Sequence, residues 1–149
     1  MLLAGCTGSG SDAPGKRPDA AGQARERAAQ DSAELLNRYD AVIAAHPALA
    51  ERLGPLRAEV ARHAGAFGGA EAGATGSPSP SGKPRKESSA PEVPADEKAA
   101  LTQLADIERQ LADGRRTALS DVPGEQARLF ASVAAAGDAH AYLLSEAGR

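Results

Sequence analysis

The sequence is poor in cysteine, in aromatic side chains and in long apolar runs. Its 149 residues include one cysteine and no tryptophan, and aromatic residues make up 3%. A single cysteine excludes an internal disulfide. No run of about 18 apolar residues provides a membrane span. So few aromatic residues favour closely packed helices built on alanine, leucine and valine over a β-sandwich.

The sequence has no strong excess of acidic or of basic residues. There are 17 lysines and arginines against 20 aspartates and glutamates, a formal net charge of −3. The two signs are interleaved along the chain, so no basic face forms, and the aromatic residues that stack on bases are scarce. We therefore expect no nucleic-acid partner.

Apolar residues recur every three or four positions in four stretches, which predicts four amphipathic helices. The first runs from about residue 21 to His46, because the residue before Pro47 is pushed out of the helical region. The second extends from Pro47 to Gly68. Within it, Pro55 lacks an amide donor, which predicts a kink or a fresh helix start.

The second pair of helices is delimited in the same way. Asp96 is a good N-cap for the third helix. A turn at Ser120-Asp121-Val122-Pro123 then leads into the fourth helix, which is expected to end at Gly148. The expected buried face of the third helix contains Leu101, Leu104, Glu108, Leu111, Arg115 and Ala118. That of the fourth contains Gln126, Leu129, Phe130, Val133, Gly137, His140, Ala141 and Leu144.

A segment rich in glycine, serine and proline separates the two helix pairs. Residues 68–95 carry no apolar stripe and are predicted to be a disordered linker. The chain then divides into one helical hairpin over 21–67 and a second over 96–149. We expect an all-α four-helix bundle made of two αα-hairpins. The linker either returns along the bundle or loops at one end.

The beginning of the chain carries the most specific motif. Leu3-Ala4-Gly5-Cys6 precedes a run of small polar residues and resembles the lipobox of bacterial lipoproteins. The resemblance implies that residues 1–5 are the remnant of a signal peptide and that Cys6 is lipidated. Residues 6–20 would then be a flexible tether. Two or three acyl chains give stable anchoring, so the implied location is the extracytoplasmic face of the cell membrane.

The segment upstream of this motif departs from the lipoprotein pattern. A signal peptide needs a basic region and an apolar region of about 7–15 residues, whereas Met1 and Leu2 alone precede Leu3. Two interpretations stay open. In one, the sequence starts inside a longer gene product. In the other, Cys6 is an ordinary free thiol of a cytosolic protein.

The paired hairpins with a long connection resemble the ferritin-like fold. A lipobox followed by an Ala/Arg-rich bundle of this kind is similar to uncharacterised lipoproteins of high-GC Gram-positive bacteria, and the resemblance covers residues 21–67 and 96–148. In metal-binding members of that fold, two helices each supply a Glu and two supply Glu-x-x-His. His63 and His140 fall on the inward stripes of the second and fourth helices. Val60 and Gly137 replace the glutamates of both motifs, while Glu108 lies on the inward stripe of the third helix.

Two roles are open for these inward polar residues. The histidines are either structural, hydrogen-bonded to Glu108, Tyr39 or the backbone, or they form a mononuclear Zn²⁺ or Cu²⁺ site in which His63, His140 and Glu108 are the ligands. Glu59, four residues before His63, is a supporting partner on the helix surface. The first role implies no cofactor, and the second implies a transition metal ion.

Other polar and apolar residues receive simpler interpretations. Arg115, near the end of the third helix, is expected to extend its charged head to water. His46 is expected to act as a helix cap or to face solvent. Tyr142 and Leu143 either continue the apolar face of the fourth helix or form an exposed patch for a partner, and a core position is preferred.

No complete catalytic constellation is recognisable, so the expected function is not enzymatic. The first hypothesis is a membrane-anchored envelope lipoprotein whose helical bundle binds a protein partner or acts as a spacer. The alternative is a metal-binding or vestigial ferritin-like protein that uses the inward histidines and glutamate. The sequence leaves the oligomeric state and the partner open.

Overall fold

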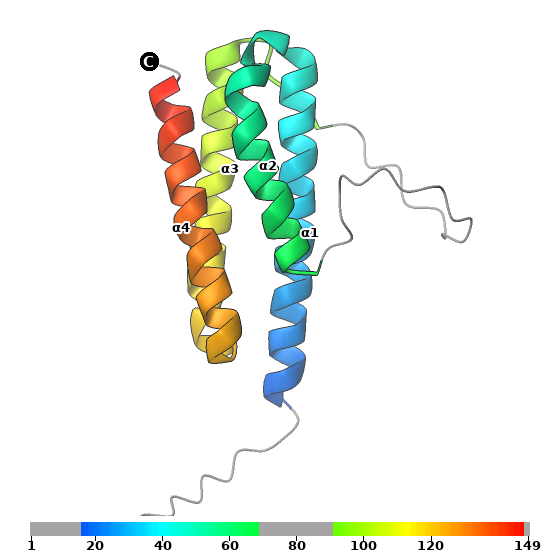
Figure 1. Ribbon diagram of the computed structural model, residues 1–149, viewed down its shortest axis with the longest axis vertical. Coiled ribbons are helices and arrows are strands. Elements are labelled where there is room, and N and C mark those ends of the chain that lie inside the picture. Colours follow the sequence, from blue (N-terminus) through cyan, green and yellow to red (C-terminus); the bar gives the residue numbers. More distant parts are fainter. Residues whose placement is uncertain (1–15, 69–90, 148–149) are drawn as a thin grey trace, which may run out of the picture.

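A computed structural model describes residues 16–68 and 91–147 of the chain, and this part is helical without any strand. Its four long helices pack side by side (Figure 1). The all-α class is therefore confirmed. The elements are α1 (Lys16–Ala45), the short 3₁₀ helix η1 (Pro47–Leu49), α2 (Ala50–Ala66), α3 (Glu97–Thr117), the 3₁₀ helix η2 (Ala118–Asp121) and α4 (Gly124–Ala147).

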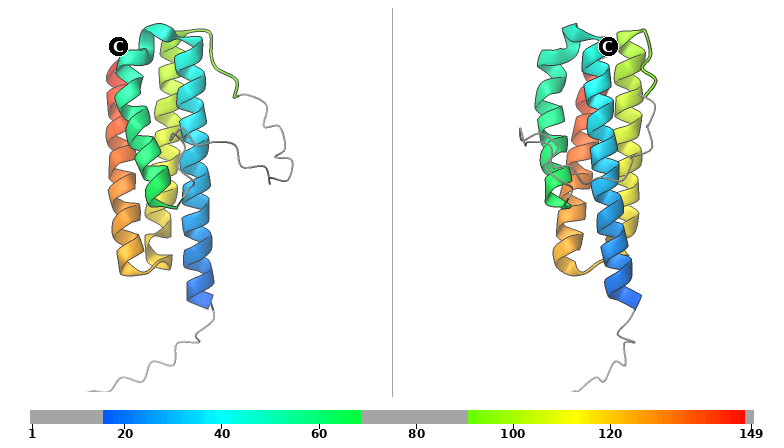
Figure 2. Two further views of the ribbon diagram at one scale, coloured as in Figure 1. Left: turned by 45° about the vertical axis from the view of Figure 1, so that its right-hand side comes forward. Right: turned by 90° about the vertical axis from the view of Figure 1, so that its right-hand side faces the viewer.

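The helices form two antiparallel pairs, α1 with α2 and α3 with α4 (Figures 1 and 2). The end of α2 lies beside the N-terminal half of α1, where the Arg25 side chain donates from Nε to the Phe67 carbonyl at 3.0 Å. The chain leading into α3 lies at the other end of α1, where the His46 Nε2 is 2.8 Å from the Pro94 carbonyl. The connection between the two pairs therefore joins opposite ends of the bundle, and α2 and α3 run in the same direction.

The starts of the helices differ in part from the sequence prediction. Helix α1 begins at Lys16, so the last residues assigned to the tether are helical instead. Pro18 lies in the first turn, where its missing amide breaks no intrahelical bond. Asp96 caps α3 as predicted, because its side chain accepts a hydrogen bond from the Ala99 amide at 2.8 Å.

Three helix boundaries were predicted from proline and glycine, and the structure confirms two of them. Helix α1 stops before His46-Pro47 as expected. The predicted fresh start at Pro55 is wrong, because α2 runs through this residue as one helix. Pro55 lies close to the N-terminal end of α2 and is exposed, so water can reach the carbonyl that loses its donor. Gly68 adopts a left-handed φ of 85° directly after α2 and ends it as predicted.

The core consists of two clusters along the bundle axis. The larger one surrounds Tyr39, Leu53 and Leu104 between all four helices. The smaller one lies near the N-terminal end of α1, where the Phe67 and Phe130 rings meet edge to face at 5.1 Å between centroids. Burying each large side chain contributes about 1.5–3 kcal/mol. Small residues of α1 such as Ala24 and Ala28 let the helices approach closely here.

The preferred core position for Tyr142 and Leu143 is wrong. Their side chains are 63% and 52% exposed. The buried stripe of α4 contains Phe130, Val133 and Leu144, and the helical period places residues 142 and 143 away from it. None of the described helices combines the length and the apolarity needed to cross a bilayer.

Candidate functional site

A buried carboxylate stands at the centre of the bundle. Glu108 of α3 is 1% exposed. Its Oε1 accepts a hydrogen bond from the Tyr39 hydroxyl of α1 at 2.8 Å and lies 3.0 Å from Nδ1 of His140 on α4. A buried charge is tolerated when such partners replace water. One carboxylate oxygen therefore joins three helices.

Two polar groups share one carboxylate oxygen in this cluster. The Tyr39 hydroxyl donates to Oε1 of Glu108, and Nδ1 of His140 makes the second contact with the same atom. Burial, and next the negative charge of Glu108, raise the pKa of Tyr39 far above its usual value. The phenol therefore stays a donor at every physiological pH.

His63 brings α2 to the same region. Its imidazole ring is stacked on that of His140, with 6.1 Å between the ring centroids and 23° between their planes. Burial is the largest cause that lowers the pKa of His63, and the neighbouring His140 and Arg115 lower it further. Glu108 and Glu59 act in the opposite direction. The ring of His63 is thus kept neutral beside His140 at neutral pH.

Gly137 of α4 lies against the Glu108 side chain. This buried glycine lies three residues before His140, one turn along α4. A Cβ at this position would be 3.4 Å from Oε2 of Glu108, and also 3.4 Å from the Glu108 carbonyl oxygen and the Ala112 side chain. The backbone of α4 therefore approaches the Glu108 carboxylate closely at Gly137. A glycine within a helix, one turn before an inward histidine, was the sequence signal for this close approach.

The expectation that Arg115 extends to water is wrong. Its side chain is buried inside the bundle and is 5% exposed. Nη2 donates to the Ser32 hydroxyl at 2.9 Å, and the guanidinium lies 5.7 Å from the centroid of the Phe67 ring. Nε has no hydrogen-bond partner among the described residues. Ser32 of α1 and the Phe67 ring cover this end of α3, and the place of Arg115 near the end of its own helix did not reveal them.

The charge of Arg115 interacts with that of Glu108 in the central cluster. Burial is the main cause that lowers the pKa of its guanidinium, while Glu108 and Asp31 raise it. Burial likewise raises the pKa of Asp31, an effect that Arg115 opposes. An arginine stays protonated in spite of such a shift. The bundle thus contains one buried anion and one buried cation on α3.

The remaining predicted site residues lie elsewhere. Glu59 is on the surface of α2, where it accepts a hydrogen bond from Arg62 at 2.6 Å. His46 is the N-cap residue of η1, but its side chain makes no capping hydrogen bond. It does not face solvent, because it is 8% exposed and binds the Pro94 carbonyl. Cys6 lies outside the described residues. Within residues 16–68 and 91–147, no three His, Cys, Asp or Glu side chains are placed to hold a metal ion.

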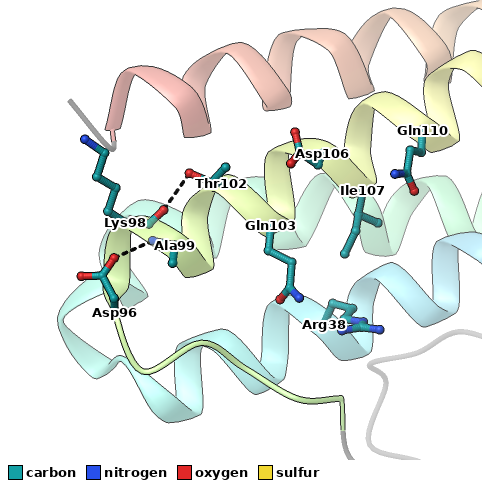
Figure 3. A pocket seen from close by; sticks show the side chains of 9 residues that line it. All are labelled: Arg38, Asp96, Lys98, Ala99, Thr102, Gln103, Asp106, Ile107 and Gln110. Carbon is teal, nitrogen blue, oxygen red and sulfur yellow. Dashed lines mark hydrogen bonds between the residues drawn. The ribbon is translucent and has the colours of Figure 1, made fainter.

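A shallow surface pocket lies between α1 and the outer side of α3 (Figure 3). Its lining combines both charge signs, with Arg38 and Lys98 against Asp96 and Asp106. Two of the polar groups are already bound to the backbone of α3, since Asp96 accepts from the Ala99 amide and the Thr102 hydroxyl donates to the Lys98 carbonyl at 2.9 Å. The lining therefore shows no convergence on one ligand chemistry.

Comparisons with protein-family models, with curated proteins and with solved structures find no match for this chain.

Proposed function

We propose that this protein is a lipid-anchored lipoprotein of the cell envelope whose helical bundle is a non-enzymatic module for partner binding or spacing. The observation that carries the proposal is the sequence Leu3-Ala4-Gly5-Cys6 followed by small polar residues. In this proposal Cys6 is acylated and becomes the first residue of the mature protein. The N-terminal end of α1 then faces the membrane, and η1 lies at the far end of the bundle.

We further propose that the bundle has a ferritin-like fold. Its support is the path of the chain. The pairs α1–α2 and α3–α4 are antiparallel, and the one long connection joins opposite ends of the bundle. A bundle with a single long crossover of this kind is characteristic of ferritin-like proteins.

In the proposed function the central cluster is a structural tie, meaning that the hydrogen bonds among Tyr39, Glu108 and His140 hold the helices together and bind no ligand. Glu108 has its Oε1 engaged by both Tyr39 and His140, and its carboxylate occupies the space beside Gly137. The Tyr39 contact joins the two hairpins, whereas the His140 and Gly137 contacts join α3 to α4 within the second hairpin. A satisfied buried network of this kind fixes how helices pack, at little net gain in free energy.

A transition-metal site is the second candidate. The observation in its favour is that Nδ1 of His140 lies against the Glu108 carboxylate. Metal-binding histidines use one ring nitrogen for such a contact and the other nitrogen as the metal ligand. His63 is stacked beside the same ring. This candidate requires His63 to reorient so that both imidazoles meet one ion. It predicts a stoichiometric metal whose removal lowers the stability of the bundle.

Lipidation is tested by expressing the chain from its own gene in its native host. The wild type is expected in the membrane fraction, with a fatty-acid probe incorporated at an N-terminal Cys6. Cys6→Ser is the matched control, because it removes the thiol with a minimal change in size and should abolish both labelling and membrane association. An unmodified Cys6 that is still joined to Gly5 in the wild-type protein would refute the proposal.

A further inference from the structure

A crevice of about 360 Å³ lies beside the buried Arg115, between α1 and the end of α3. Its polar walls come from Arg27 and Asp31 of α1, Arg115 of α3 and Asp121 of η2, and its apolar floor includes Ala28 and Phe130. The volume is at the lower end of the range for small-molecule sites, about 300–1,000 Å³. None of the residues that form the central cluster at Glu108 lines this crevice, so it is a separate site for a small ligand.

Arg115 carries hydrogen-bond donors that the fold does not use. A guanidinium offers donors on all three of its nitrogens. Nη2 donates to the Ser32 hydroxyl, whereas Nε has no partner among the described residues although the side chain is 5% exposed. Buried donors are nearly always paired, so an unpaired one requires an explanation. Packing does not supply it, because an apolar side chain of similar volume is often as stable as a poorly paired buried charge.

Charges of both signs line the crevice. Arg27 and Arg115 are the cations, and Asp31 and Asp121 are the anions. Arg27 donates from Nε to the Gln23 carbonyl of its own helix at 3.3 Å, an exposed contact that leaves the rest of its guanidinium accessible. Burial raises the pKa of Asp31, and the positive charges of Arg115 and Arg27 lower it, so both arginines act on this carboxylate. Two cations and two anions around one crevice match a ligand that itself carries both signs.

We propose that this crevice binds a free amino acid with a small apolar side chain. In the complex the ligand carboxylate accepts hydrogen bonds from Arg115 and Arg27, because guanidinium groups match carboxylates in geometry and charge. The ligand ammonium group donates to Asp31. Its apolar side chain packs on Ala28 and the Phe130 ring, which are the apolar part of the lining. The proposal goes beyond the membrane-anchored role and does not depend on it.

A ligand with a single charge matches the lining less well. A simple carboxylate is attracted by Arg115 and Arg27 but repelled by Asp31 and Asp121, which line the same crevice. A simple amine or a metal cation meets the opposite conflict. In an amino acid the two charged groups are neighbours, so each can face the protein groups of opposite sign. The lining therefore selects for a zwitterion and against both single ions.

Isothermal titration calorimetry of the purified full chain with free alanine, valine and leucine tests the proposal. We expect at least one of them to bind with a dissociation constant between about 10 µM and 1 mM, because few atoms contribute to the binding of so small a ligand. Acetate and ethylamine carry the two charged groups separately, and each should bind at least about tenfold more weakly. The proposal is overturned if none of the three amino acids binds at about 10 mM, or if acetate binds as tightly as the best of them.

Two variants locate the binding site. Arg115→Met and Asp31→Asn should each raise the dissociation constant at least about tenfold, because each removes one charged partner of the ligand. Asp31 is exposed, so its replacement tests the site even if Arg115→Met does not fold. Arg109→Met is the matched control and should bind like the wild type, since Arg109 is an exposed arginine of α3 that pairs with Asp106 outside the crevice. Unchanged binding in either folded crevice variant overturns the proposal.

Discussion

Helix α3 carries two buried charges of opposite sign on the same face, about two turns apart, and the bundle accommodates them differently. Glu108 receives hydrogen bonds from two other helices at one oxygen. Arg115 has one hydroxyl partner and an aromatic face, and its Nε has no partner in the described part of the chain. The anion is held by a closed network, whereas the cation is held largely by packing.

This difference indicates which of the two charges the fold depends on. Removing one partner of a satisfied buried charge leaves the others without compensation, which is costly. Replacing a poorly paired buried charge by an apolar side chain of similar volume is often neutral. Glu108 therefore organises the meeting of the two hairpins. Arg115 fills the space between α3, Ser32 and the Phe67 ring.

The largest effect is expected from Glu108→Ala. This change leaves the Tyr39 hydroxyl and the His140 imidazole without their acceptor and removes the anion that opposes Arg115. We expect a loss of about 3–5 kcal/mol in the free energy of unfolding, measured by urea denaturation. Glu108→Gln is the matched control, because it keeps the shape and one acceptor oxygen, and should cost less. A loss below about 1 kcal/mol for the alanine variant would contradict a closed network at Glu108.

Tyr39→Phe separates the hydrogen bond from the packing. The ring stays in the core, while the carboxylate loses one donor at 2.8 Å. Hydrogen bonds to charged groups contribute about 1.5–3 kcal/mol, so a loss of this size is expected in the same denaturation assay. Combined with Glu108→Gln, the two changes should cost less than their sum, because they share one contact. Strict additivity would show that Tyr39 and Glu108 act independently.

The stacked histidines predict a dependence of stability on pH. The pKa of folded His63 is lowered from its usual value of 6.5, mainly by burial and then by His140 and Arg115. The unfolded chain therefore takes up the proton first as the pH falls, and the folded state loses stability below about pH 6.5. The negative charges of Glu108 and Glu59 raise the pKa of His63 and so reduce the effect.

Urea denaturation between about pH 7.5 and 5.5, a window around the usual pKa of histidine, measures this effect. His63→Gln is the control, because it keeps a polar side chain that does not titrate. The decrease in stability toward low pH should be smaller in this variant than in the wild type. Equal slopes for both proteins would mean that other groups cause the pH dependence.

The smallest effect is expected from Arg115→Met. Methionine fills most of the same volume and removes the buried Nε that has no partner in the described chain. The free energy of unfolding should change by about 1 kcal/mol or less in either direction. Arg115→Ala should cost more, since it leaves a cavity beside the Phe67 ring. A methionine variant as unstable as Glu108→Ala would remove the distinction between the two charges.

Much of the fold could be predicted from local chemistry. The period of the apolar residues gave four helices, and Asp96, His46-Pro47 and Gly68 marked boundaries that the structure confirms. The early start of α1 was missed because Pro18 and the polar residues around it have a composition typical of a tether. Composition does not reveal that the first turn of a helix tolerates proline.

The central cluster was harder to predict than the helices. The inward period of Glu108 and His140 was visible in the sequence, but the hydrogen bonds depend on the distance between helices. Arg115 and Tyr142 show that helical period alone does not predict burial: Arg115 was expected to be exposed and is buried, and Tyr142 was expected to be buried and is exposed. Helical period assigns a direction, whereas the neighbouring helices decide whether that direction is covered. They cover Arg115 and leave Tyr142 63% exposed.

The distinction between a structural tie and a metal centre is most directly tested by thermal unfolding of the full chain with and without Zn²⁺, Cu²⁺ or Fe²⁺, together with its metal content as purified. A structural tie at Glu108 predicts no stoichiometric metal and no rise in Tm on metal addition, while His140→Ala lowers the Tm equally in both conditions. A stoichiometric transition metal that stabilises the wild type, and that His63→Ala and His140→Ala both abolish, would contradict this account.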